Sequence, residues 1–198
     1  MNRTDICNMA LSFISRQRID DLNDDSEEAK HCTIYYDHTR KRLLKLYSWG
    51  FARRIQQLAL RTETAPGWDY CYGYPSQCLG VQFVFDEQHA KIRETMRQEW
   101  QVMTLTGNDR VIATNVEDAY AEFIQDVVDT EEFSEEFIEA LARMLAANLA
   151  APLTGSSELV NYNLQMAQSS INMAMLENAT ESEITTKWPR KYELARFR

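Results

Sequence analysis

Clusters of acidic side chains are the features of this sequence that come nearest to a site for chemistry. The first is the turn Asp20-Asp21-Leu22-Asn23-Asp24-Asp25, which offers the carboxylate oxygens that calcium binds. The turn lacks the central glycine and the ligand spacing of a calcium loop, so we expect no metal there. Asp25 and Glu28 have the spacing of a capping box, which predicts that they begin a long helix.

A second acidic cluster consists of Glu131, Glu132, Glu135 and Glu136, the residue type that a two-carboxylate glycosidase uses. These glutamates flank a predicted helix start, where acidic side chains complement the helix dipole. The sequence contains no G-x-S-x-G, no phosphate-binding glycine loop and no H-E-x-x-H. We therefore expect no enzymatic activity, no catalytic residues and no cofactor.

The thiols and imidazoles do not form a metal-binding pattern either. Cys7, Cys32, Cys71 and Cys78 have no C-x-x-C spacing, and the three histidines complete no zinc motif. No apolar run approaches the roughly 18 residues of a membrane span, and the first residues do not resemble a signal peptide. We expect a protein made in the cytoplasm, with reduced thiols and no membrane contact.

Helical periodicity occupies both ends of the chain. Apolar residues at helical spacing predict a helix over residues 4–16, capped by Thr4 or Asp5, and a longer one over residues 26–48. Arg40 is assigned to the polar face of the longer helix.

Two more helices are predicted after the middle of the chain. Ser134 is a suitable N-cap for an Ala-rich helix that Pro152 and Gly155 punctuate. A last helix, over residues 156–178, is rich in methionine, which indicates either core packing or an adaptable contact surface.

The middle of the chain has the pattern of strands. Residues 55–60 are ambiguous between a helix end and a strand. Five later segments favour strands: residues 68–75, 79–85, 100–105, 110–114 and 120–128. Thr106-Gly107-Asn108-Asp109 is typical of a hairpin turn. These segments predict a small antiparallel sheet inserted between helices.

The predicted fold class is therefore mainly α: a bundle of four long and short helices with an inserted antiparallel β subdomain and an extended C-terminal arm. In this scheme residues 1–186 form one domain. Its helical bundle covers residues 4–60 and 134–178, its β insertion covers residues 68–128, and residues 187–198 form a docking arm.

The C-terminal segment differs from the rest of the chain in charge. Residues 187–198 hold five Lys or Arg and one Glu, a net charge of +4. Because the whole chain has a net charge of −9, residues 1–186 have a net charge of −13. The segment follows a polar linker over residues 180–186. Because Trp, Tyr and Arg dominate interface energetics, the segment is predicted to dock on a partner or to fold back on its own body.

Three aromatic anchors, Tyr47, Trp49 and Phe51, end the long helix and are expected to pack a corner of the core. They belong to the pattern R-x-x-L-L-x-x-Y-x-W-x-F-A, and with later segments they resemble the tubular tail protein A family, the head-to-tail adaptors of short-tailed double-stranded DNA phages. The matching positions are Arg40, Leu43, Leu44, Tyr47, Trp49, Phe51, Ala52, Gly67, Tyr70, Tyr72, Pro75, Cys78, Leu79, Val81, Tyr120, Val127, Phe133, Phe137, Leu141, Ala142, Leu145, Ala146, Leu153 and Thr154.

The resemblance implies a structural protein of the virion neck, assembled in the host cytoplasm. It implies a twelve-fold ring that binds the portal above and the tail nozzle below and extends the DNA channel. An acidic wall lets double-stranded DNA pass without specific binding. The resemblance also assigns portal binding to the C-terminal arm, whose predicted contact residues are Lys187, Trp188, Arg190, Lys191, Tyr192, Arg196, Phe197 and Arg198.

Two other functions stay open at this point. A tail-associated glycan or peptidoglycan hydrolase would use the abundant carboxylates. A head-completion or stopper protein would share the ring but bind a different partner.

Overall fold

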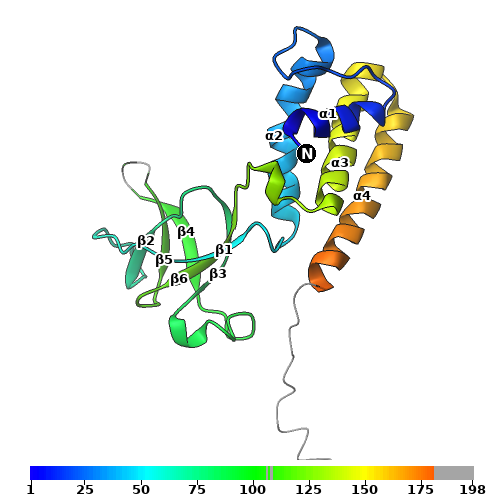
Figure 1. Cartoon of the computed structure of the whole chain (residues 1–198). Coiled ribbons are helices and arrows are strands. Elements are labelled where there is room, and N and C mark those ends of the chain that lie inside the picture. The colour runs from blue at the N-terminus through cyan, green and yellow to red at the C-terminus, as the bar shows by residue number, and fades with distance from the viewer. Residues whose placement is uncertain (106, 108, 181–198) are drawn as a thin grey trace, which may run out of the picture.

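The computed structural model describes residues 1–105, 107 and 109–180, and within them it shows a helical lobe and a β lobe (Figure 1). The helical lobe consists of α1 (Arg3–Ser12), α2 (Glu27–Leu46), α3 (Glu135–Thr154) and α4 (Ser157–Thr180). The chain leaves α2 for the β lobe and returns to α3. None of the helices in these residues is long and apolar enough to cross a membrane.

Local hydrogen bonds begin the helices, in part at other residues than predicted. Asn2, rather than Thr4 or Asp5, caps α1, and its side chain and that of Asp5 form a capping box. The predicted cap of α2 by Asp25 is also wrong, because the Ser26 hydroxyl accepts the hydrogen bond that caps this helix.

The end and start of α3 follow the sequence closely. The predicted N-cap is confirmed: the Ser134 hydroxyl accepts a hydrogen bond from the Phe137 amide at 3.3 Å. Pro152 lies inside α3 and does not end it. The helix ends at Gly155, whose φ of +68° is a left-handed conformation that glycine adopts without steric cost.

Six strands form two three-stranded antiparallel sheets in the described part of the chain. The first sheet has the order β1 (Arg53–Gln57), β6 (Tyr120–Gln125) and β3 (Cys78–Phe85). The second has the order β2 (Tyr70–Gly73), β5 (Arg110–Thr114) and β4 (Trp100–Thr104). Short 3-10 helices, η1 (Glu87–His89) and η2 (Thr130–Glu132), follow β3 and β6.

The prediction of a mainly α fold with one inserted sheet is wrong. The described residues are 45% helical and 19% strand, a mixed fold in which two sheets make a lobe of their own. One reason is the segment after the long helix, which is strand β1 and pairs with β6 across more than 60 residues of sequence. A second reason is that Tyr72, Ile112, Val84 and Phe123 pack together, so each sheet covers the other.

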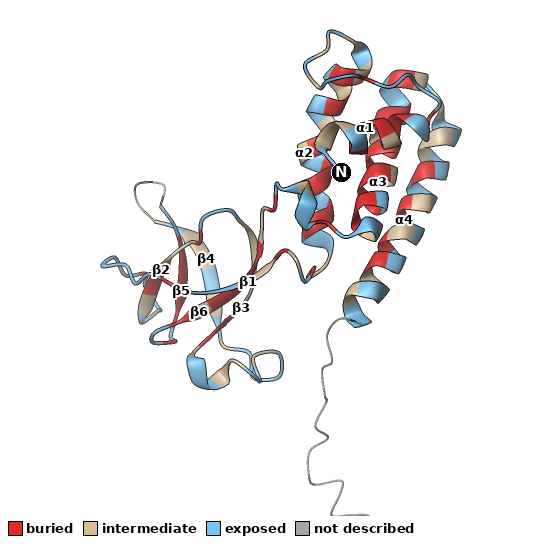
Figure 2. Ribbon diagram, in the orientation of Figure 1, coloured by how far each residue is buried: buried red, intermediate tan, exposed pale blue. Residues whose placement is uncertain are grey.

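The main core surrounds α3, which packs against the other three helices. Figure 2 shows buried residues concentrated on α3 and on the faces of α1 and α2 next to it. The predicted aromatic corner is confirmed: Trp49 is buried, its indole nitrogen donates a hydrogen bond to the Leu43 carbonyl at 3.0 Å, and its ring meets that of Phe137 edge to face at 5.2 Å.

Candidate functional site

The predicted portal-binding residues, from Lys187 to Arg198, lie outside the described residues, as does most of the predicted linker. The structure describes the chain up to Thr180, the last residue of α4. The candidate sites that it does describe are therefore the surface of α4, which precedes the C-terminal segment in the sequence, and the pockets around α3.

Helix α4 lacks charge over an unusual length. Between Glu158 and Glu177, eighteen consecutive residues contain no Asp, Glu, Lys or Arg. One side of the helix is buried on α3 through Asn163, Ala167 and Ile171. The absence of charge extends to the opposite side, which faces solvent in the monomer.

This solvent-facing side, which we call the outer stripe, carries Tyr162, Gln165, Ser169, Met173 and Leu176 at spacings of three and four residues. Tyr162 is 51% exposed, Met173 62% and Leu176 64%. Interface centres are depleted in charge and enriched in Tyr and Met, and helices meet along seams of this spacing. The outer stripe therefore has the composition and geometry of a helix-contacting surface.

A groove of about 390 Å³ runs beside the outer stripe, between α3 and α4. Met166 and Met173 contribute its apolar lining from α4, and Glu136 and Glu139 contribute carboxylates from α3. Methionine adapts its shape to what it contacts, so this groove adds accommodating surface to the outer stripe.

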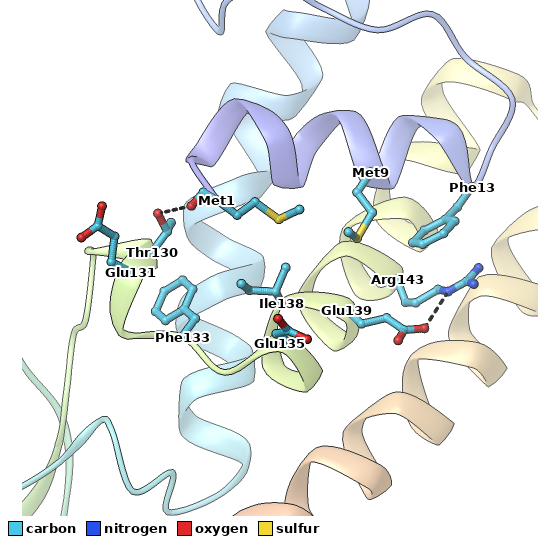
Figure 3. Close-up of a pocket in the computed structure, with 10 residues that line it drawn as sticks. All are labelled: Met1, Met9, Phe13, Thr130, Glu131, Phe133, Glu135, Ile138, Glu139 and Arg143. Carbon is cyan, nitrogen blue, oxygen red and sulfur yellow. Dashed lines mark hydrogen bonds and ion pairs between the residues drawn. The ribbon is translucent and has the colours of Figure 1, made fainter.

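A larger pocket of about 630 Å³, which we call the α1–α3 pocket, lies between α1, η2 and the start of α3 (Figure 3). Its apolar lining comes from Met1, Met9, Phe13, Phe133 and Ile138. Figure 3 shows Met1, Met9, Phe13 and Ile138 between the two helices, with Phe133 and Glu131 at the η2 end and with Glu135 and Glu139 on α3.

The glutamates of this pocket are Glu131, Glu135 and Glu139. Glu139 lies 3.9 Å from Arg143, whose guanidinium covers the Phe13 ring. In the part of the chain that the structure describes, Glu131 and Glu135 have no ion-pair partner. The pocket thus combines five apolar side chains with three carboxylates and one guanidinium.

Two of the four glutamates that the hydrolase alternative would use make contacts with other side chains. Glu132 forms an ion pair with Arg54 at 3.0 Å. A hydrogen bond with the Glu177 carboxyl group is the main reason that the pKa of Glu136 is lowered, whereas a general acid needs a raised pKa.

The acidic turn forms its own hydrogen bonds. The Asp24 carboxylate accepts the amides of Asp20 and Asp21, both at 3.0 Å. Among residues 1–105, 107 and 109–180, no three His, Cys, Asp or Glu side chains are grouped in a way that could hold a metal ion.

Sequence reasoning misplaced Arg40, which is not on a polar face but is 2% exposed. Its guanidinium donates hydrogen bonds to the Asp126 carboxylate at 2.6 Å and to the Val127 carbonyl, and so ties α2 to the end of β6. A signal was present, because Arg40 fills the gap between Tyr36 and Leu43 in the buried stripe of α2.

No protein-family model matches this sequence, and no curated protein matches it.

Proposed function

We propose that this chain is a head-to-tail adaptor of a short-tailed double-stranded DNA phage, which forms a twelve-fold ring between the portal and the tail nozzle. The resemblance of its segments to the tubular tail protein A family motivates the proposal. The outer stripe of α4 is the observation that carries it, because a ring subunit needs a surface for its neighbours and this uncharged helix face is exposed in the monomer.

Charge supports the same function. Residues 1–186 carry a net charge of −13, and DNA carries about one negative charge per 1.7 Å of helix axis. A channel of such subunits repels the phosphate backbone, so the duplex passes without being held. The proposed location of the protein is accordingly the virion neck, after assembly in the host cytoplasm.

The test is ring assembly, measured by light scattering and electron microscopy on the protein alone and mixed with the portal of the same phage. We expect a collar on the portal for the wild type. Met173→Glu should stay folded and fail to assemble, because it buries a charge in the subunit contact. Leu60→Glu is the matched control, since Leu60 is 63% exposed and lies in the β lobe.

Two results would contradict the proposal. One is a wild-type chain that ignores the portal, and the other is a Met173→Glu chain that assembles as well as the control. The predicted portal contact has its own test: removing residues 187–198 should leave the fold intact and abolish portal binding.

A further inference from the structure

We infer that the α1–α3 pocket binds residues 187–198 of the same chain. This inference does not depend on the adaptor function. It concerns where the basic, aromatic C-terminal segment lies when no partner holds it.

The pocket fits such an occupant in both shape and charge. Its volume of about 630 Å³ is in the range of ligand-binding pockets, and five of its ten lining residues are apolar. Phe13 and Phe133 contribute aromatic rings to its wall, with Arg143 covering one face of Phe13 and Phe133 7% exposed. The carboxylates of Glu131 and Glu135, which have no ion-pair partner among the described residues, belong to its lining, where a cation meets them without leaving water entirely.

The C-terminal segment has the complementary composition. Trp188 and Tyr192 are four residues apart, and Lys187, Arg190 and Lys191 surround them. An aromatic ring among the apolar side chains of the pocket places these cations near its glutamates. Elsewhere in the chain, no run of twelve residues holds five Lys or Arg together with two aromatic residues.

The last turn of α4 brings the segment within reach. Asn178 accepts a hydrogen bond from the Gly50 amide at 2.7 Å and lines a hollow whose wall includes Phe133. The same Phe133 lines the α1–α3 pocket, so the two cavities are neighbours. The eight residues from Thr180 to Trp188 span up to about 26 Å when extended. This is longer than the width of the Phe133 ring, which lines both cavities.

The experiment follows Trp188 in the full chain. With 5-fluorotryptophan incorporated, the four tryptophans give four fluorine resonances, and Trp188→Phe identifies the one of interest. We expect a soluble gadolinium chelate to broaden the Trp188 resonance much less than free 5-fluorotryptophan. Glu131→Lys with Glu135→Lys should abolish this protection. Glu63→Lys with Glu117→Lys, the same charge change on exposed residues of the β lobe, should preserve it.

A second variant avoids any change to the folded body. Arg190→Glu with Lys191→Glu should also expose Trp188, and combining it with the Glu131 and Glu135 reversals should restore protection. The inference is overturned if wild-type Trp188 is broadened like the free amino acid, or if both sets of reversals leave it protected. Protection that rises with protein concentration would overturn the same-chain occupant. Ring assembly is scored separately, so neither result decides the adaptor proposal.

Discussion

Replacing Arg40 with Met is expected to lower the free energy of unfolding by about 3 kcal/mol. The side chain is 2% exposed, and its removal leaves the Val127 carbonyl without this donor and the Asp126 carboxylate without its nearest cation. Breaking a buried ion pair costs about 3–5 kcal/mol. The lower end applies here because Lys41, 3.2 Å from Asp126, still compensates part of the charge.

The matched control is Arg54→Met. Arg54 pairs with Glu132 at 3.0 Å and also donates to the Phe51 carbonyl at 2.7 Å, as Arg40 does to Val127, but the Arg54 and Glu132 side chains are 39% and 46% exposed. An exposed pair contributes about 0–1 kcal/mol, so the same substitution should cost far less at Arg54. Urea denaturation, followed by tryptophan fluorescence and far-ultraviolet circular dichroism, measures both variants.

Equal losses at Arg40 and Arg54 would refute the reasoning, because they would show that burial adds nothing to the Arg40 contact. A double variant sharpens the test. Arg40→Met with Asp126→Leu should be less destabilised than the sum of the two single variants, since neither buried charge is then left alone.

Three further predictions concern stability. Burial alone would raise the pKa of Asp126, but Arg40 and Lys41 outweigh it and lower the pKa. The stability advantage of the wild type over Asp126→Asn should be complete above the unfolded pKa of about 3.9 and disappear as pH falls through the folded pKa. A constant advantage in urea titrations from pH 6 to pH 2 would contradict this. Ser134→Ala removes the α3 cap and should lower the free energy of unfolding by about 1 kcal/mol in the same assay. An unchanged free energy of unfolding would show that the cap is dispensable. Gly155→Ala should cost about 1–2 kcal/mol through its positive φ alone, because no atom lies within 4 Å of the added carbon, and an unchanged midpoint would refute this.

The sequence predicted those features that local patterns determine. The helix over residues 26–48 appears as α2, and the segments 100–105 and 110–114 appear as the paired strands β4 and β5. In each case the apolar period and a nearby turn or cap agree.

Features that depend on distant segments were beyond local patterns. The pairing of β1 with β6 joins residues more than 60 positions apart, and the sequence of neither segment indicates which strand it pairs with. The same holds for the α1–α3 pocket, where Met1 and Phe13 line the same cavity as Phe133. Arg40 was misplaced because its charge was read as exposure, although its position in the helix period is that of a buried residue.

The uncharged outer stripe of α4 has a consequence for how the protein behaves in solution. Copies with a net charge of −9 repel one another, and this repulsion is weakest where two uncharged helix faces approach. Added salt shortens the range of the repulsion to about 10 Å at 0.1 M and leaves apolar contact intact. Self-association through this face should therefore strengthen as ionic strength rises, the opposite of what holds for a contact made by ion pairs.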